Sequence, residues 1–402
     1  MRQTFITFPL VLLFSVLLTG CGDDTRTAIR DATIGWRTDE GKVDPETKPT
    51  ELSKDFAAKI TIKERWSRQV GKGTADLYLK IVPATDGTSV YVADREGGVL
   101  SLAVADGHKQ WSARDENRLI SAGPGLGDGA VLVGTSQGEV VARDATSGKK
   151  LWIAKVSSEV VAVPRAANGV VLVRTGDSNL FALDSRTGVE KWVYDRSVPA
   201  LTLRGAGAPT LHEGVAYTGF ANGRVVALRL ETGSPLWDVQ LAQPTGRSDL
   251  ERLVDIDGEP AIKDSFAYIG GFQGKIAALN TDNGNVEWSR VMSTYDNVAV
   301  DEQRVYVTDE RGVVWALNRT DGSAVWRQKD LKFRHLTAPT RFERYLVVGD
   351  FEGYLHWLDA ETGEIVARLQ IDKKRILTAP INMGDVLLGY SSSGRIAVFS
   401  AK

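Results

Sequence analysis

The chain has 402 residues, of which 43% are hydrophobic, so it is long enough to bury a large core. Its 49 basic and 51 acidic residues nearly cancel, and they are interspersed, so the chain lacks the basic surface of a nucleic-acid-binding protein. A single cysteine excludes an internal disulfide.

Residues 1–20 have the pattern of a secretion signal. Arg2 supplies a positive charge, and the apolar run over residues 5–18 is short and is followed by polar sequence. Small residues stand directly before Cys21, as at a cleavage site. We therefore predict a signal peptide over residues 1–20.

The segment Leu18-Thr19-Gly20-Cys21 resembles the bacterial lipobox, in which the cysteine receives a diacylglyceryl group and its new amino group is acylated. Each buried methylene is worth about 0.8 kcal/mol, so more than one acyl chain makes a stable membrane anchor. Gly22 stands where aspartate would resemble the inner-membrane retention signal, which favours the outer membrane, facing the periplasm. The alternative is an ordinary signal peptide with a chance cysteine.

Residues 21–58 are polar, lack strand periodicity and contain two glycines and two prolines after residue 34. This composition predicts a lipidated flexible tether. The globular domain is expected over residues 59–402.

The globular part is organised by a repeat in which a glycine is followed four residues later by a tryptophan. Between these markers lie short β-branched runs separated by turn residues, as at residues 131–134, 140–142 and 150–153. Each unit of about 41 residues predicts four short antiparallel strands, which bury both faces only when neighbouring units stack. The tryptophans are interpreted as packing plugs, with ligand stacking as the alternative. The pairs are Gly107/Trp111, Gly148/Trp152, Gly188/Trp192, Gly233/Trp237, Gly284/Trp288 and Gly322/Trp326.

A proline recurs in the first strand of each unit, and Ala299 stands in for it in one unit. Because proline cannot donate to a ladder, it favours an edge, and we expect these strands to line a central channel. The prolines are Pro83, Pro124, Pro164, Pro209, Pro260, Pro339 and Pro380.

Eight units are present, but the last, residues 381–399, has no fourth strand or tryptophan. Residues 64–68 have no repeat before them and share Trp-Ser-Arg with residues 286–290. We therefore predict an all-β fold, an eight-bladed β-propeller of four-stranded antiparallel blades whose N-terminal strand closes the last blade. In the seventh unit Ala367 occupies the tryptophan position.

No catalytic constellation is evident. The histidines, His108, His212, His335 and His356, fall in different units without metal-ligand spacing, and the cysteine is assigned to lipid. We expect no catalytic residue, no metal and no cofactor.

Residues 182–192 are similar to the tryptophan-docking motif of pyrroloquinoline quinone dehydrogenases, which are also eight-bladed propellers. Those enzymes commonly use calcium ligands, a catalytic aspartate and often a disulfide between adjacent cysteines, which this chain cannot form. Motif and fold are architectural and do not establish the activity. A quinoprotein dehydrogenase is the enzymatic alternative, and an envelope module that binds glycan is a third hypothesis.

Two insertions depart from the period. Trp237 and Trp288 are 51 residues apart, with the extra sequence at residues 243–258, and a smaller excess lies at residues 197–205. Both precede the first strand of a unit, so we expect them at the same end of the ring. Insertions on one face of a propeller often form its binding face.

The insertions and two later segments resemble the BamB family of outer-membrane assembly lipoproteins. The resemblance rests on residues 201–205 (LTLRG), 252–257 (RLVDID), 336–339 (LTAP) and 349–357 (GDFEGYLHW), and it covers the whole mature chain. It implies a non-catalytic scaffold of the β-barrel assembly complex whose loop face binds the periplasmic POTRA domains of BamA. It also implies assistance to unfolded outer-membrane proteins, with β-augmentation at strand edges as a weaker hypothesis.

The contact residues implied by this resemblance are Leu201, Leu203, Arg204, Asp255 and Asp257. Leucines beside an arginine have the composition of an interface hot spot, and the planar guanidinium suits carboxylates. In an extended segment the two aspartates would face the same side. They could form an acidic patch, hold Arg204 or pair with a partner's basic side chains, and a purely solvated loop is the alternative.

Overall fold

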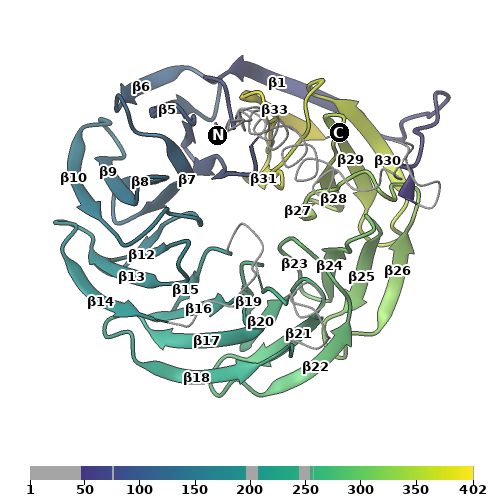
Figure 1. Ribbon diagram of the computed structural model, residues 1–402. Coiled ribbons are helices and arrows are strands. Elements are labelled where there is room, and N and C mark those ends of the chain that lie inside the picture. Colours follow the sequence, from purple (N-terminus) through teal and green to yellow (C-terminus); the bar gives the residue numbers. More distant parts are fainter. Residues whose placement is uncertain (1–46, 75–76, 196–206, 244–253, 257, 402) are drawn as a thin grey trace, which may run out of the picture. The chain divides into compact units, whose positions relative to one another are not determined.

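The computed structural model describes residues 47–74, 77–195, 207–243, 254–256 and 258–401. One compact unit begins at Glu51, eight residues before the expected start of the globular domain, and extends to the end of the chain. In this unit the described strands form eight sheets arranged as a ring, with the fourth strand of each at the outer rim (Figure 1). The predicted all-β, eight-bladed propeller is confirmed.

The blades follow one another in chain order, and consecutive strands within each blade are antiparallel neighbours. Blade 1 contains β3 (Ala84–Thr85), β4 (Ser89–Ala93), β5 (Gly98–Ala103) and β6 (Lys109–Arg114). Blade 2 contains β7 (Ile120–Gly127), β8 (Ala130–Thr135), β9 (Glu139–Asp144) and β10 (Lys150–Lys155), and β2 (Lys80–Ile81) pairs in parallel with β7. Blade 3 contains β11 (Arg165–Ala167), β12 (Val170–Arg174), β13 (Leu180–Asp184) and β14 (Glu190–Tyr194). Blade 4 contains β15 (Thr210–His212), β16 (Val215–Gly219), β17 (Arg224–Arg229) and β18 (Pro235–Gln240).

The second half of the ring continues the same pattern. Blade 5 contains β19 (Ala261–Lys263), β20 (Phe266–Ile269), β21 (Lys275–Asn280) and β22 (Val286–Val291). Blade 6 contains β23 (Ala299–Val300), β24 (Arg304–Thr308), β25 (Val314–Asn318) and β26 (Ala324–Gln328). Blade 7 contains β27 (Thr340–Phe342), β28 (Tyr345–Gly349), β29 (Tyr354–Asp359) and β30 (Ile365–Gln370). Blade 8 contains β31 (Ile381–Asn382), β32 (Leu387–Tyr390), β33 (Arg395–Ala401) and the N-terminal strand β1 (Ile62–Gln69).

Strand position within a blade explains the residue pattern. All five residues of β12, a second strand, are buried, because neighbouring blades cover both of its faces. In β10, a fourth strand at the rim, only Trp152 is buried and the residues beside it are exposed. The apolar runs of the sequence are therefore the middle strands, and the alternating segments are the rim strands.

The two ends of the chain meet in blade 8. β1 pairs antiparallel with β33, and Trp66 stands opposite Val398. This pairing supplies the missing fourth strand and covers the edge that β33 would otherwise leave open. The predicted closure of the ring is confirmed.

The inner strands correct one detail of the proline pattern. In blade 7, Pro339 directly precedes β27, whose first residue Thr340 pairs with Val347. In blade 6, Ala299 pairs with the equivalent residue, Tyr306, so Val298 occupies the proline position and the assignment to Ala299 was wrong by one residue. Without a proline, only the pairing with the second strand defines this register.

In seven of the eight blades, one tryptophan on the rim strand packs against the following blade. This arrangement confirms the packing interpretation. Each indole N–H donates to a backbone carbonyl of the following blade, and each ring packs on a glycine there. At Gly148, φ is +72° and an added Cβ would lie 2.5 Å from Cε3 of Trp111, so the dock requires glycine. The donor–acceptor pairs are Trp66–Val104, Trp111–Ala145, Trp152–Ser185, Trp192–Leu230, Trp237–Thr281, Trp288–Arg319 and Trp326–Ala360, at 2.7 to 3.1 Å.

The two ends of the ring differ in their connections. We call the loop end the one formed by the connections from second to third strands and from each blade to the next. The turn end is formed by the hairpins from first to second strands and by the turns from third to fourth strands.

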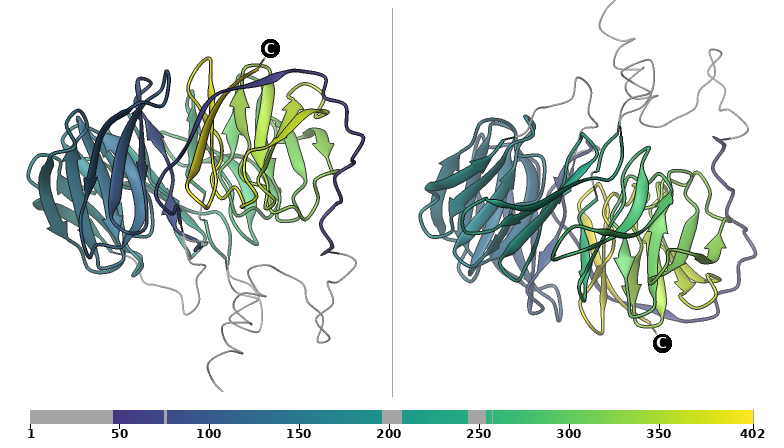
Figure 2. Two further views of the ribbon diagram at one scale, coloured as in Figure 1. Left: turned by 90° about the horizontal axis from the view of Figure 1, so that it is seen from above. Right: turned by 90° about the horizontal axis from the view of Figure 1, so that it is seen from below.

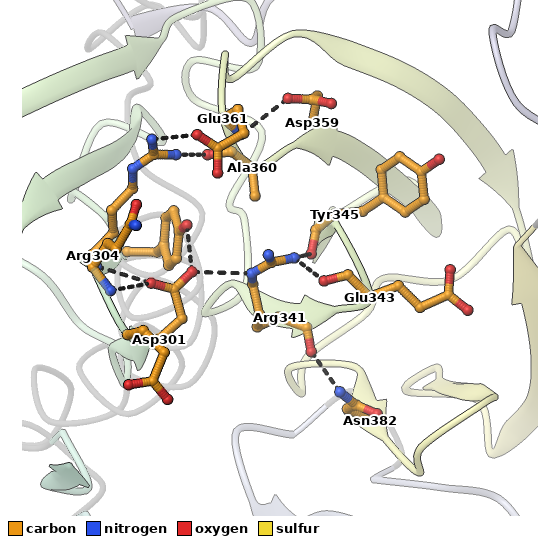
Figure 3. A network of polar contacts seen from close by, with 12 residues as sticks. Asp301, Arg304, Arg341, Glu343, Tyr345, Asp359, Ala360, Glu361 and Asn382 are labelled. Carbon is orange, nitrogen blue, oxygen red and sulfur yellow. Dashed lines mark hydrogen bonds and ion pairs between the residues drawn. The ribbon is translucent and has the colours of Figure 1, made fainter. Parts of the chain in front are cut away.

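Polar contacts hold blades 6, 7 and 8 together at the turn end (Figure 3). Arg341 Nε of blade 7 donates to Asp301 Oδ2 of blade 6 at 3.1 Å, and Asn382 Nδ2 of blade 8 donates to the Arg341 carbonyl at 2.7 Å. Arg304 pairs with Glu361 at 2.5 Å, which adds a second link between blades 6 and 7. These contacts strengthen the part of the ring that contains the closure.

Candidate functional site

Both insertions attach at the loop end. Residues 195–209 join β14 to β15, and residues 241–260 join β18 to β19, and both are connections from one blade to the next. Their shared location follows from the order of strands in a blade. The prediction that they lie at one end of the ring is confirmed for their points of attachment.

Backbone hydrogen bonds running around the ring tie the loop end together. The connection between the second and third strands of a blade bonds to the connection that entered that blade. Examples are Gly176 N to Glu159 O at 2.8 Å, Glu310 N to Ser293 O at 3.0 Å and Ser392 N to Arg375 O at 2.9 Å. Where both connections are described, as in these examples, the second-to-third connection is supported by the connection that enters its blade.

Asp255 is the one predicted contact residue within the described part of the chain. Its carbonyl accepts a hydrogen bond from Phe272 N at 2.7 Å, and its own N–H donates to the Phe272 carbonyl at 3.4 Å. Val254 and Ile256 on either side are buried, and Ile256 packs into the core between blades 4 and 5. The end of the longer insertion is thus anchored to the second-to-third connection of blade 5.

Asp255 is only 3% exposed. This burial disfavours the interpretation of Asp255 as part of an open acidic patch. Leu201, Leu203, Arg204 and Asp257 lie outside the described residues, as does Cys21. The structure therefore does not test whether these residues come together.

An aromatic pair beside Asp255 was not anticipated from the sequence. The rings of Phe272 and Tyr295 stack with centroids 4.8 Å apart and an interplanar angle of 21°. Tyr295 is 49% exposed, and burial of part of its ring raises the pKa of its hydroxyl. The only sequence signal was an aromatic between glycines in the segment Gly270-Gly271-Phe272-Gln273-Gly274. The pair extends the surface next to Asp255 with an aromatic side chain of the kind enriched at protein interfaces.

The segment at residues 349–357 holds a buried ionic cluster in blade 7. Arg334 Nε donates to Asp350 Oδ2 at 2.8 Å, and His356 Nε2 lies 2.9 Å from the same oxygen. Burial alone would raise the pKa of Asp350, but the hydrogen bond with His356 and the charge of Arg334 hold it below its ordinary value. Burial lowers the pKa of His356.

This cluster has a structural role at the loop end. The Arg334 guanidinium lies 5.0 Å from the Phe351 ring centroid, and Phe351 N donates to the Arg334 carbonyl at 3.1 Å. Asp350 also accepts hydrogen bonds from the N–H groups of Glu352 and Tyr354, both at 2.9 Å. The charged residues therefore shape the loops at this end, and Arg334, Asp350 and His356 are buried from solvent.

Two other kinds of site are absent from the described residues. No group of three or more histidine, cysteine or acidic side chains could hold a metal ion. In the same part of the chain, no helix is long and apolar enough to cross a membrane.

The fold and the loop end define a class, the eight-bladed propellers with PQQ-like repeats whose blade-to-blade connections carry insertions. A family model described as "Outer membrane protein assembly factor BamB" matches residues 113–328 and 316–402. The chain belongs to this family of non-catalytic assembly factors, and membership implies association with the outer membrane.

Known proteins agree with the family assignment. The chain is 37% identical over 357 residues to the outer membrane protein assembly factor BamB of Pseudomonas aeruginosa, covering 89% of this chain and 93% of that relative. The crystal structure of BamB from Moraxella catarrhalis matches with a TM-score of 0.77 and 27% identity over 85% of this chain and 100% of that one.

A europium-containing methanol dehydrogenase also matches, with a TM-score of 0.70 over 84% of this chain and 93% of that one. Its sequence identity is 14%, so this match shows the propeller fold alone. The quinoprotein alternative therefore gains nothing from the shared fold.

Proposed function

We propose that this protein is a scaffold subunit of the β-barrel assembly complex and binds the POTRA domains of BamA through its loop end. The observation that carries the proposal is the anchoring of the longer insertion at Asp255, beside an aromatic pair, within a family of outer-membrane assembly factors. A rigid support for a binding loop lowers the conformational entropy lost on binding. In this role the protein assists the folding and insertion of outer-membrane proteins without catalysis.

Within the proposed interface, Leu201 and Leu203 supply an apolar anchor and Arg204 supplies a planar donor to a carboxylate of the partner. Asp255 supports the base of the loop, and Asp257 pairs with a basic side chain of the partner or with Arg204. Cys21, carrying the diacylglyceryl group and the N-acyl chain, holds the propeller on the periplasmic side of the outer membrane. The burial of Asp255 supports its role at the base of the loop, in contrast to the contact roles proposed for the other residues.

Co-purification tests this proposal. Arg204→Glu should abolish recovery of the BamA barrel protein with the tagged chain, while the thermal unfolding temperature stays unchanged. Arg186→Glu is the matched control, because Arg186 is exposed in the turn between β13 and β14, at the opposite end of the ring. Wild-type recovery by the Arg204 variant, or loss of recovery by both variants, would place the interface elsewhere.

Asp255 needs a milder change, because reversing a buried charge destabilises the fold as well as the interface. Asp255→Asn keeps the size of the side chain and removes the charge. It should weaken binding to isolated POTRA domains, and the thermal unfolding temperature of the same sample shows how much of that loss comes from loosening of the loop end.

A further inference from the structure

Residues 51–61 form a strap that lies along the outer strand of blade 7 before β1 begins. The Lys59 N–H donates to the Val366 carbonyl at 2.8 Å, and the Lys59 ammonium pairs with Glu364 at the exposed edge. Val366 belongs to β30 and Glu364 directly precedes it. The rim strand of blade 7 is thus partly covered by a segment from the other end of the chain.

Further toward the N-terminus the strap contacts the same strand through Arg368. Its guanidinium donates to the Ser53 carbonyl and lies 4.8 Å from the Phe56 ring centroid. Leu52 packs against the apolar cluster between blades 6 and 7, which includes Leu331 and Leu336 of the loop end. The strap therefore binds to the propeller through its backbone, an aromatic ring and an apolar side chain.

The order of these contacts gives the direction of the strap. β30 begins at the turn end with Ile365 and reaches the loop end at Gln370. Lys59 contacts the start of β30, whereas Phe56 and Ser53 contact Arg368 further along. The strap consequently descends from the loop end to the turn end, reverses, and returns as β1, and Figure 2 shows this segment along the side of the ring.

The reversal lies at the seam between blades 7 and 8. Ile60 and Ile62 pack against the apolar cluster that contains Trp357 and Phe399. Ile62 pairs with Ala401, the last residue of β33, at the turn end. The N-terminal part of the compact unit is therefore held at both ends of the ring, and its first residue, Glu51, is delivered to the loop end.

We propose that the docked strap makes the loop end the membrane-facing end of the propeller. A chain anchored by lipid near its N-terminus pulls on the propeller at the point where it enters the compact unit, and the strap places that point beside the loop end. If the strap were released, the first fixed residues would be Ile60 and Ile62 at the turn end, and the pull would act on the opposite side. Phe56 and Arg368 thus decide which end of the ring a lipid anchor draws toward the membrane.

The tether is short enough for its point of attachment to affect which end of the propeller faces the membrane. A tether of about 30 residues has a root-mean-square span of about 30 Å if it is flexible. A six-residue strand is about 20 Å long, so the two ends of a blade differ in distance from the membrane by an amount comparable with that span. The inference rests on the proposed anchor at Cys21, and it places the candidate partner surface near Asp255 between the propeller and the membrane.

The unique thiol allows a test that does not depend on lipidation in the cell. Mature protein produced without lipid is coupled through Cys21 to a maleimide lipid in vesicles that also carry acceptor-labelled lipid. A donor dye is placed through a non-natural residue at Glu310 of the loop end or at Gln303 of the turn end, both exposed and both in blade 6. We expect more energy transfer from Glu310 than from Gln303.

Releasing the strap should remove that difference. In Phe56→Ala/Arg368→Ala, transfer from Gln303 should equal or exceed transfer from Glu310, and the Lys59 amide should lose its protection from hydrogen exchange. Arg327→Ala is the matched control, because Arg327 occupies the equivalent position in blade 6, where it lies 5.5 Å from the Trp315 ring centroid. This variant should keep the wild-type difference and the protected amide.

Equal transfer from the two sites in the wild-type protein, or rapid exchange of the Lys59 amide, would overturn the inference. Because no partner protein is present in the vesicles, such a failure is distinguishable from a failure of the proposed binding to POTRA domains. A protein that binds POTRA domains normally but shows no preferred end would retain the proposed function and lose only this inference.

Discussion

Trp357 in β29 stands directly opposite Ala367 in β30, which reverses the arrangement in the five preceding blades. In those blades an alanine of the third strand faces the tryptophan of the fourth, as Ala142 faces Trp152. The large side chain has moved by one strand, and Trp357 is 1% exposed against Phe399 of blade 8. The seam between blades 7 and 8 is therefore filled by a different tryptophan, and the described residues there form no tryptophan–glycine dock.

Trp357→Ala should lower the free energy of unfolding by about 3–5 kcal/mol, the usual cost of removing a large aromatic from a core. Urea unfolding followed by tryptophan fluorescence and circular dichroism measures this change. Adding Ala367→Trp should recover part of the loss, because the pair then keeps its total volume. A double variant that is no more stable than Trp357→Ala would show that the two positions do not share one space.

Gly148→Ala should destabilise the interface between blades 1 and 2. The positive φ costs about 1–2 kcal/mol for any residue with a Cβ, and the clash with Trp111 adds about 1–3 kcal/mol. Gly169→Ala is the matched control, since Gly169 has φ of +78° and nothing within 4 Å of an added Cβ. Equal losses of unfolding free energy in the two variants would contradict the dock.

Because of the buried ionic cluster of blade 7, the difference in free energy of unfolding between the wild-type protein and Asp350→Asn should depend on pH. Asp350 has a pKa below its ordinary 3.8 in the folded protein, so its ionised form stabilises the fold above pH 3.8. That contribution is lost as the pH falls through the folded-state value. Asp350→Asn should cost about 3 kcal/mol at pH 7, because it removes the buried charge partner of Arg334 and leaves the partly exposed Glu352 as its remaining carboxylate.

Urea unfolding of the wild-type protein and of Asp350→Asn at pH 7, 5 and 3 measures the difference. Ionisation of Asp350 contributes the same difference in free energy of unfolding between the two proteins at pH 7 and at pH 5. That contribution should become smaller toward pH 3, where Asp350 begins to be protonated. Protonation of His356 in the unfolded chain lowers the stability of the wild-type protein below pH 6.5, because burial lowers the folded-state pKa of this residue. Equal free energies of unfolding for the two proteins at pH 7 would contradict the assigned pairing.

Deleting residues 59–70 should destabilise blade 8, although the deletion lies at the other end of the chain. It removes β1 and Trp66, exposes the edge of β33 and opens the ring. Hydrogen exchange should rise first in β32 and β33, and the open edge should promote self-association, seen by light scattering. Deleting residues 1–46 is the control and should leave exchange in blade 8 unchanged.

Cys21→Ser tests the proposed anchor. The variant should move from the membrane fraction to the soluble periplasmic fraction, because at least two acyl chains are needed for stable retention. The intact mass of the mature wild-type protein should exceed that of the polypeptide from residue 21 by the mass of the lipid. A mature protein with an unmodified cysteine, or a membrane-bound Cys21→Ser variant, would contradict the lipobox assignment.

The repeat made most of the architecture predictable, because packing between blades is local in sequence. Each Gly-to-Trp spacing reports a third-to-fourth strand turn, and each dock joins one unit to the next along the chain. Even the closure was predictable, since residues 64–68 carry a rim-strand pattern without the strands that should precede it. The resemblance to the family rests on the two insertions and two later segments. The residues of the insertions are not set by packing between blades.

Other features depend on contacts that no local pattern encodes. Ala367 occupies the tryptophan position of the seventh unit, and only the strand register shows that Trp357 fills the space from the opposite strand. Asp255 is held by backbone hydrogen bonds to Phe272, which belongs to a separate connection, the one between the second and third strands of the next blade. The strap has a polar composition typical of a linker, and its hold on Arg368 joins residues more than 300 positions apart.

The sequence by itself therefore determined the number of blades, their order and the way in which the ring closes, because those features repeat or complete a local pattern. Only the tertiary structure decided where the N-terminal segment enters the propeller and which residues support the candidate binding surface. Such contacts join individual residues that do not recur from blade to blade, so they leave no periodic signature in the chain.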